Sequence, residues 1–249
     1  MAGLEGLTGK SLKKTVVIFG LDDILVPGKV LQSVDHKKIG IVLAHLKTLS
    51  EKIPSFRFFL VCGYQKEKTF EKIRENKLDA FFSEENTRFV SQEFLDSKEP
   101  MDREIYDQQI AKDPLFKDEF FKQKAIDQIV ESLNVSKDRV VFVGHDIWFD
   151  AFYSQRFSQV DFVLVKDGLA NQSVPFERVM KGLNYIHLDW DDLRKVLLGK
   201  LPVQNLDPLK NFIHFQLQRQ LVSSETMGKL VEARQKQLEE KARKDLMEL

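Results

Sequence analysis

Two groups of acidic residues follow apolar runs of this 249-residue chain. Asp22 and Asp23 come shortly after the run Thr15–Phe19. The second group follows another apolar run and also contains an imidazole: His145, Asp146 and Asp150. Carboxylates can act as general acids or bases, and together with an imidazole they can ligate a metal ion. Asp after a strand can also simply cap a turn, and one His with carboxylates falls short of a specific metal-ligand spacing, so both interpretations stay open.

The elements that must position these residues alternate between short apolar runs and stretches of helical period. This alternation is typical of a parallel sheet covered by helices. The predicted strands are Thr15–Phe19, Phe58–Cys62, Ala80–Phe82, Arg139–Val143, Asp161–Val165 and an edge strand at Tyr185–Leu188. The predicted helices are Lys37–Lys52 with Ile41 on its apolar face, Lys66–Asn76, Glu119–Asn134, and Trp190–Leu198 with Asp189 as its N-cap. The sequence therefore predicts an α/β fold with a doubly wound, Rossmann-like parallel sheet.

The carboxyl ends of parallel strands meet at one edge of such a sheet, and ligands bind beyond that edge. We therefore expect Asp22, Lys122, Asp146 and Asp150 to converge there. Lys122 opens the predicted helix before the strand Arg139–Val143. A surface role for this lysine and a contact with a bound phosphate are both consistent with that position.

Four stretches, in this order, resemble the motifs of the haloacid dehalogenase-like (HAD-like) phosphohydrolase superfamily. They are Gly20–Val26, Cys62–Tyr64, Lys122 and Gly144–Asp150, and the resemblance covers roughly Thr15–Leu198. It implies a chemistry in which one Asp attacks phosphorus and a second Asp is the general acid and base. A Ser or Thr and a Lys hold phosphoryl oxygens, and a final acidic pair binds Mg²⁺ together with the first Asp.

Several positions of the resemblance depart from the family pattern. Gly20 stands where the family has the attacking Asp, Asp22 keeps the general-acid position, and Ile24 replaces the Thr. The resemblance implies a ligand-binding set of Asp23, Cys62, Gly63, Lys122 and Gly144. It leaves as metal candidates Asp146, Asp150 and His145, the last in place of an acid. Mg²⁺ is the one cofactor implied, and its site is weakened because two acids are missing. The alternative interpretation of Cys62 is that it is a small buried apolar residue and does not bind a ligand.

Two hypotheses of function follow from these departures. Loss of the nucleophile of a covalent mechanism costs about 10⁶ in turnover in a serine protease. The leading hypothesis is therefore a catalytically degenerate HAD-like protein that binds a protein partner or a small phosphorylated ligand. The alternative is an active phosphohydrolase with an altered mechanism. There, Asp22 or Asp23 would activate water directly, and His145, Asp146 and Asp150 would hold the metal.

Composition bounds the partners. The chain has 38 basic and 38 acidic residues, so no chain-wide field attracts nucleic acid or an acidic membrane, and we expect neither as a partner. The single cysteine cannot form an internal disulfide, and the first 14 residues lack the apolar segment of a signal peptide. We therefore expect a cytoplasmic protein without membrane spans.

The predicted organisation is one α/β domain over residues 1–200 and a helical C-terminal extension over 201–249. An irregular insertion at about 83–118 forms a reduced, lid-like cap, with a short helix near Arg103–Ala111. An aromatic cluster packs on the sheet or meets a partner: Trp148, Phe149, Phe152 and Tyr153. The tail carries Glu residues four positions before Lys or Arg, which favours a solvated helix; self-association or a protein partner is the other interpretation.

Overall fold

The computed structural model describes residues 4, 7–28, 31–90, 116–145, 150, 158–166 and 185–201. The chain divides into two units, Met1–Leu206 and Asp207–Leu249. The second unit lies outside the described residues, and so do the predicted short helix Arg103–Ala111, the aromatic cluster beginning at Trp148, and Asp146. The fold below is that of the first unit.

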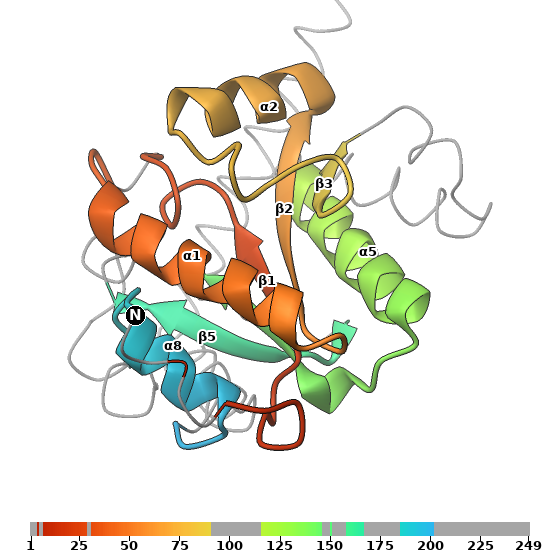
Figure 1. Cartoon of the computed structure of the whole chain (residues 1–249). Helices are drawn as coiled ribbons and strands as arrows, with labels where there is room; N and C mark the ends of the chain where they lie inside the picture. The colour runs from red at the N-terminus through yellow and green to blue at the C-terminus, as the bar shows by residue number, and fades with distance from the viewer. Residues whose placement is uncertain are drawn as a thin grey trace, which may run out of the picture. The chain divides into compact units, whose positions relative to one another are not determined.

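A sheet of six strands, all parallel, forms the centre of the described residues (Figure 1). The strands are β1 (Val16–Gly20), β2 (Arg57–Gln65), β3 (Thr87–Val90), β4 (Val140–Gly144), β5 (Asp161–Val165) and β6 (Tyr185–Ile186). Their order across the sheet is β3-β2-β1-β4-β5-β6, the order of the Rossmann fold. The predicted α/β class and doubly wound sheet are therefore confirmed.

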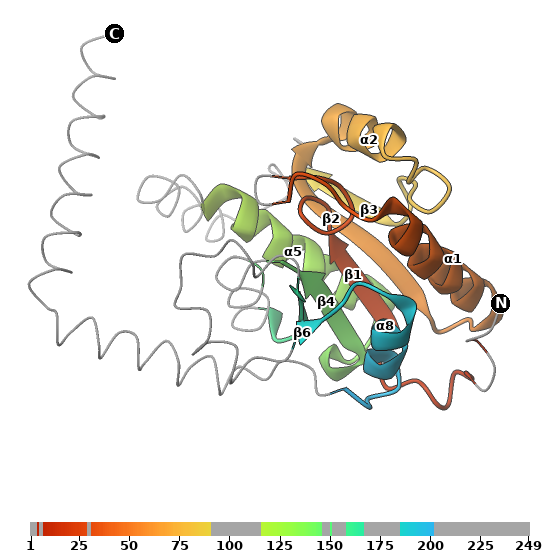
Figure 2. The ribbon, with the colours of Figure 1, turned by 90° about the vertical axis from the view of Figure 1, so that its left-hand side faces the viewer.

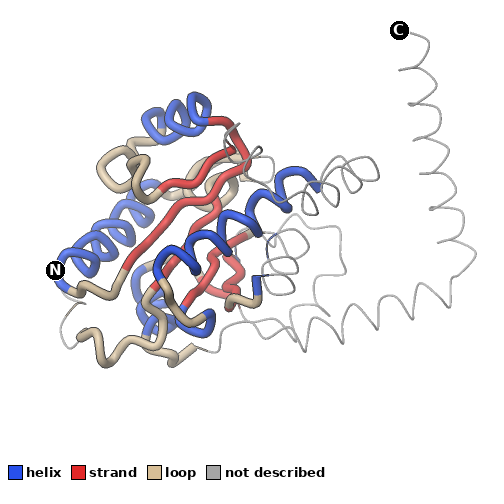
Figure 3. The backbone as a smooth tube through the Cα atoms, turned by 90° about the vertical axis from the view of Figure 1, so that its right-hand side faces the viewer, coloured by secondary structure: helices blue, strands red, loops and turns tan. Residues whose placement is uncertain are grey.

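Helices cover both faces of the sheet. They are α1 (His36–Lys52), α2 (Lys66–Glu75), α5 (Phe116–Leu133) and α8 (Trp190–Leu197), with a short 3₁₀ turn at Lys137–Arg139. Helices α1 and α8 contact each other, and α5 lies on the opposite face, as the views in Figures 2 and 3 show. Every residue of β1 and of β4 is buried, because a central strand of a two-sided sheet has no solvent face.

Local signals in the sequence define several helix ends. The side chain of Asp35 accepts a hydrogen bond from the backbone N–H of Lys38 and caps α1, and Asp189 does the same for α8 through Asp192, as predicted. After α5, Asn134 takes a φ of 47°, a left-handed conformation that Asn tolerates well at a helix end. These caps fix where each helix begins or ends relative to the sheet edge.

Three predictions about elements were wrong. Ala80–Phe82 forms a turn, with the N–H groups of Phe81 and Phe82 donating to Leu78, and the third strand is Thr87–Val90. Of these three residues Phe82 is buried, and its ring packs edge-on against Phe58 with the ring centroids 5.7 Å apart.

An irregular stretch was expected at about 83–118, and residues 91–115 of it lie outside the described residues. Strand β3 lies within it, and α5 begins at Phe116, so Lys122 lies inside this helix rather than at its start. Ile41 is 47% exposed and does not face the core as its spacing suggested. Within the described part of the chain, no helix has the length and apolar character required to cross a membrane.

Candidate functional site

The strand order predicts a ligand site between β1 and β4. The order reverses direction between these two strands, and open α/β sheets bind ligands beyond the carboxyl ends at such a switch point. β1 ends there at Gly20, and β4 ends at Gly144. The polar residues just after these two glycines are therefore the first candidates for function.

A hydrogen-bonded turn after β1 carries Asp22 and Asp23. The N–H groups of Leu25 and Val26 both donate to the Leu21 carbonyl, at 3.0 and 3.2 Å. Asp23 has a φ of 60°, a conformation in which Asp is several-fold enriched over most residues with a side chain. Its Oδ1 accepts a 2.6 Å hydrogen bond from the N–H of Leu31. The turn therefore buries the carboxylate of Asp23, whose residue is 3% exposed.

A chain of charge contacts joins Asp23, His145, Asp150 and Lys122. The Nε2 of His145 lies 3.5 Å from Asp23 Oδ2, and its Nδ1 lies 3.3 Å from Asp150 Oδ2. The backbone N–H of His145 donates to the same Asp150 oxygen at 3.0 Å. Lys122 Nζ donates to the other oxygen, Oδ1, at 2.8 Å. Both oxygens of Asp150 thus contact donors of the chain itself.

The contacts between these charged side chains determine their pKa values. Burial opposes the charge of Asp150, but the Lys122 ammonium and the His145 imidazole outweigh it and hold the pKa of Asp150 far below its ordinary value. Burial lowers the pKa of His145, but the Asp150 and Asp23 carboxylates outweigh it and raise the pKa above 6.5. The carboxylate of Asp150 therefore lies between the Lys122 ammonium and the His145 imidazole, and its charge favours the protonated form of that imidazole.

Asp22 points to a different partner. Lys72 of α2 donates to Asp22 Oδ1 at 2.7 Å, and the two side chains are 23% and 27% exposed. The same ammonium lies 4.9 Å from the ring centroid of Tyr64. We use the name edge cluster for the six charged residues at this place: Asp22, Asp23, Lys72, Lys122, His145 and Asp150. Of the predicted site residues, Asp23, His145, Asp150 and Lys122 lie in contact with one another. Asp22 pairs with Lys72, a residue that the sequence did not suggest.

Gly20 ends β1 where the resemblance places a nucleophile. A Cβ on Gly20 would lie 3.0 Å from Ile24 Cδ1 and 3.9 Å from Phe142 Cζ. The first contact is tighter than most real contacts, although the end of a flexible Ile side chain can move. Ile24 is 2% exposed and occupies the space that a side chain at position 20 would need. A side chain at position 20 would therefore have an apolar neighbour.

Gly144 is required by close packing. A Cβ there would lie 2.6 Å from both Asp150 Cβ and Phe162 Cε2, distances that real Cβ atoms do not reach. The absence of a side chain therefore lets Asp150 approach the end of β4. This gives the predicted ligand-binding residue Gly144 a packing role, and ligand contact at this glycine stays a prediction.

Cys62 lies inside β2 and is 3% exposed. Its Sγ is 3.1 Å from Thr69 Oγ1, and burial raises the pKa of its thiol. Asp22 and Lys122 lie near enough to act on that pKa, so this side of β2 faces the edge cluster. Gly63 follows in the same strand and is partly exposed. Contact of Cys62 or Gly63 with a ligand stays a prediction.

The described acids fit a Mg²⁺ ion poorly. Mg²⁺ needs several oxygen ligands in a near-octahedral arrangement. Both oxygens of Asp150 already accept from Lys122 and His145, Asp23 accepts from Leu31, and Asp22 is paired with Lys72. Within the described ranges, no group of three His, Cys, Asp or Glu side chains has the geometry to hold a metal ion. We therefore derive no step through a metal.

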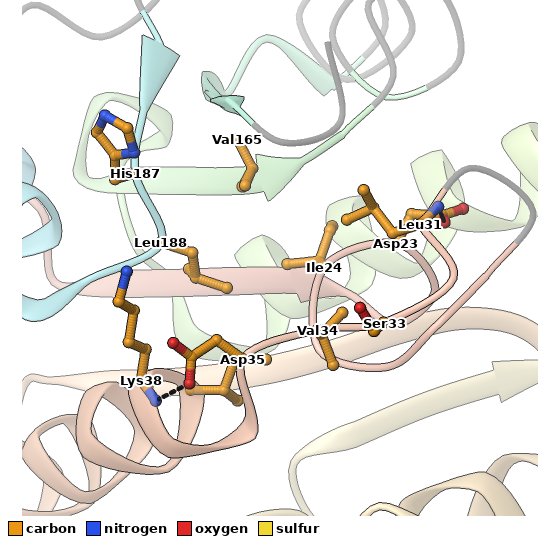
Figure 4. A pocket seen from close by; sticks show the side chains of 11 residues that line it. Asp23, Ile24, Leu31, Ser33, Val34, Asp35, Lys38, Val165, His187 and Leu188 are labelled. Atoms are coloured by element: carbon orange, nitrogen blue, oxygen red, sulfur yellow. Dashed lines mark hydrogen bonds between the residues drawn. The ribbon is translucent and has the colours of Figure 1, made fainter. Parts of the chain in front are cut away.

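A pocket of about 280 Å³ lies beside the edge cluster, between the turn after β1, the start of α1 and the ends of β5 and β6 (Figure 4). We call it the α1 pocket. Its apolar lining includes Ile24, Leu31, Val34, Ile39, Val165 and Leu188. Its polar lining is Asp23, Ser33, Asp35, Lys38 and His187. Asp23 is thus shared between the pocket and the edge cluster.

Comparisons with solved structures find a similar chain of low sequence identity. It belongs to a protein from Vibrio cholerae assigned as a 3-deoxy-D-manno-octulosonate 8-phosphate phosphatase. The two chains are 11% identical, and the match covers 78% of this chain and 90% of that one with a TM-score of 0.39. No protein-family model and no curated protein sequence matches the chain. The account of the site therefore rests on its own geometry.

Sequence reasoning missed Lys72, Lys38 and His187. Lys72 lies in the lysine-rich helix α2, and its sequence does not distinguish it from Lys66 or Lys68. Its place two turns into a helix that follows β2 directly was the one available signal. Lys38 looks like an ordinary exposed residue of a first helical turn, and His187 follows the edge strand. Only the fold brings these two together at one pocket.

Proposed function

We propose that this chain is a HAD-like protein without phosphoryl-transfer activity, and that it acts by binding a protein partner or a small phosphorylated ligand. The observation that supports the proposal is that the carboxylates of the edge cluster are paired with basic side chains of the protein itself. Gly20 offers no nucleophile, and Asp150 spends both carboxylate oxygens on Lys122 and His145. A site that neutralises its own acids has little field left to hold Mg²⁺ or to activate water.

The same pairing of acids and lysines limits where a phosphorylated ligand can bind. A phosphate at the edge cluster would have to compete with Asp150 for Lys122, or with Asp22 for Lys72. Asp150 is 1% exposed, whereas Asp22 keeps 27% of its side chain accessible. Release of Lys122 would leave one oxygen of the buried Asp150 carboxylate without its donor, with only the contacts to His145 remaining, which is costly. Lys72 is therefore the cation that a phosphate ligand at this edge would recruit.

A phosphatase assay on the purified full chain tests the proposal. The probes are p-nitrophenyl phosphate and a set of sugar phosphates with Mg²⁺ present, and we expect no turnover above background. Saturable turnover that disappears in Asp22→Asn would overturn the proposal and favour the altered hydrolase. Turnover that survives in Asp22→Asn but disappears in Asp23→Asn would overturn the proposal as well. Turnover that survives in both variants would indicate a contaminant, which repurification removes before the assay is repeated.

Calorimetry with inorganic phosphate then separates the two kinds of binding. Saturable binding that weakens in Lys72→Met but not in Lys66→Met supports a phosphorylated ligand at the edge cluster. Lys66 is a suitable control because it lies on the same helix and pairs with Glu84 at 2.6 Å instead. Absence of phosphate binding favours a protein partner.

A further inference from the structure

The α1 pocket combines an apolar centre with unequal charges at its rim. In Figure 4, Lys38 and His187 lie at one end, Asp23 and Leu31 lie at the other, and Ile24, Val34 and Val165 lie between. The buried members of the apolar wall belong to different elements: Ile24 to the turn after β1, Ile39 to α1 and Val165 to β5. A concave surface with apolar walls and few polar groups is the usual form of a small-molecule site.

The acids of the pocket are occupied within the chain. Asp23 accepts from Leu31 and faces the imidazole of His145. Asp35 accepts from the backbone N–H of Lys38 as the N-cap of α1, where the positive end of the helix dipole offsets its charge. Neither carboxylate is therefore available to attract a cation strongly.

The cation of the pocket is more available. Lys38 is exposed and lines the pocket, and within the described residues no carboxylate makes an ion pair with its ammonium group. The first turn of α1 holds no acidic residue. The pocket lining thus presents one ammonium group, at the end where Lys38 and His187 lie, while its two carboxylates accept hydrogen bonds from backbone N–H groups.

We propose that the α1 pocket binds a small organic anion, with its carboxylate or phosphate at Lys38 and its apolar body over Ile24, Val34, Val165 and Leu188. A volume of about 280 Å³ corresponds to roughly nine water molecules, so the ligand is of the size of a phenyl ring with a short acidic arm. The site goes beyond the proposed function, because its anion contact lies at Lys38 and not at Lys72 or Lys122.

The experiment is an NMR titration of the full chain, labelled at Ile, Leu and Val methyl groups, with 3-phenylpropionate. We expect saturable shifts at the methyl groups of Ile24, Val165 and Leu188. The methyl groups of Ile129, which is buried in α5, serve as the control and should not move. Absence of saturable shifts at the pocket methyl groups would overturn the proposal.

Charge specificity is tested by two analogues and two variants. We expect 3-phenylpropionamide and 3-phenylpropylamine to bind at least about threefold more weakly than the acid, the scale of one exposed charge contact. Lys38→Gln should weaken binding of the acid by a similar factor and leave the amide unchanged. Lys37→Gln removes the same charge from the neighbouring residue, which does not line the pocket, and should have a smaller effect. Equal affinities for the three probes, or equal effects of the two variants, would overturn the anion assignment.

These outcomes are distinct from those of the phosphatase assay. Failure of 3-phenylpropionate to bind leaves the absence of turnover as it was. Turnover in the phosphatase assay would overturn the proposed function without moving the methyl shifts at the α1 pocket.

Discussion

The edge cluster and the α1 pocket lie next to each other and share Asp23, but their carboxylates contact different kinds of groups. In the edge cluster each carboxylate has a basic side chain of the protein beside it: Asp150 has Lys122, Asp22 has Lys72 and Asp23 has His145. In the pocket the acids are held by backbone N–H groups, and Lys38 is left to the solvent. The first arrangement stabilises the fold through internal ion pairs, and the second leaves the Lys38 ammonium accessible to a ligand.

The two Lys–Asp ion pairs of the edge cluster also differ from each other in how deeply they are buried. The Asp150 side chain is 1% exposed, whereas that of Asp22 is 27% exposed. Solvent screens an exposed pair strongly, so its net contribution to stability is small. A buried carboxylate without its partner is costly, so loss of the lysine matters far more there.

The largest expected effect is therefore that of Lys122→Met. We expect it to lower the free energy of unfolding by about 3 to 5 kcal/mol, because Asp150 would remain buried next to a single remaining cation. Lys72→Met is the matched control, with an expected loss of about 1 kcal/mol or less. Urea denaturation of both variants measures the difference. Equal losses would show that the two pairs contribute equally to stability and would contradict the larger role of the buried Lys122–Asp150 pair.

Gly144→Ala is expected to come next. The added methyl would collide with Asp150 and Phe162 at 2.6 Å, and overpacking of this kind costs about 1 to 3 kcal/mol. Gly40→Ala in α1 is the control, since a Cβ there meets no atom within 4 Å and should stabilise the helix by about 1 kcal/mol. Thermal unfolding should shift the two variants in opposite directions. A harmless Gly144→Ala would contradict the close approach of Asp150 to β4.

The pH dependence of stability is expected to be smaller and specific to His145. Its folded pKa is raised above 6.5 by Asp150 and Asp23, with Lys122 opposing them. A raised folded pKa means that the stabilisation is complete below pH 6.5 and is lost as the pH rises through the folded value. Unfolding free energies measured from pH 6 to pH 9 should fall over that window. His145→Gln should flatten the profile, and an unchanged slope in that variant would exclude His145 as its source.

The sequence predicted the sheet well because its signals are local. The apolar β-branched run Val16–Gly20 and the similar run of β4 are strands buried on both faces, and no other element suits that composition. Ala80–Phe82 has the same apolar character, but only tertiary packing of Phe82 on Phe58 decides that it is a turn. Periodicity alone cannot make that distinction for three residues.

The sequence pointed to the acids of the site and to Lys122 and His145, but it did not point to Lys72 or Lys38. Asp22, Asp23 and Asp150 follow strand ends, and a parallel sheet brings such positions to one edge. Lys72 and Lys38 lie on helices rich in lysine, where sequence gives no reason to prefer one residue over its neighbours. Which lysine reaches an acid depends on how α2 and α1 pack against the sheet, and that is a property of the fold.

The most direct test of the central claim is calorimetric titration of the full chain with MgCl₂. If His145 and Lys122 neutralise the acids of the edge cluster, no binding should appear at millimolar Mg²⁺. The double variant Gly20→Asp with His145→Asp should then gain measurable affinity, because it restores two oxygen ligands and removes a competing cation. Stoichiometric Mg²⁺ binding by the unmodified chain, weakened in Asp150→Asn, would contradict the account.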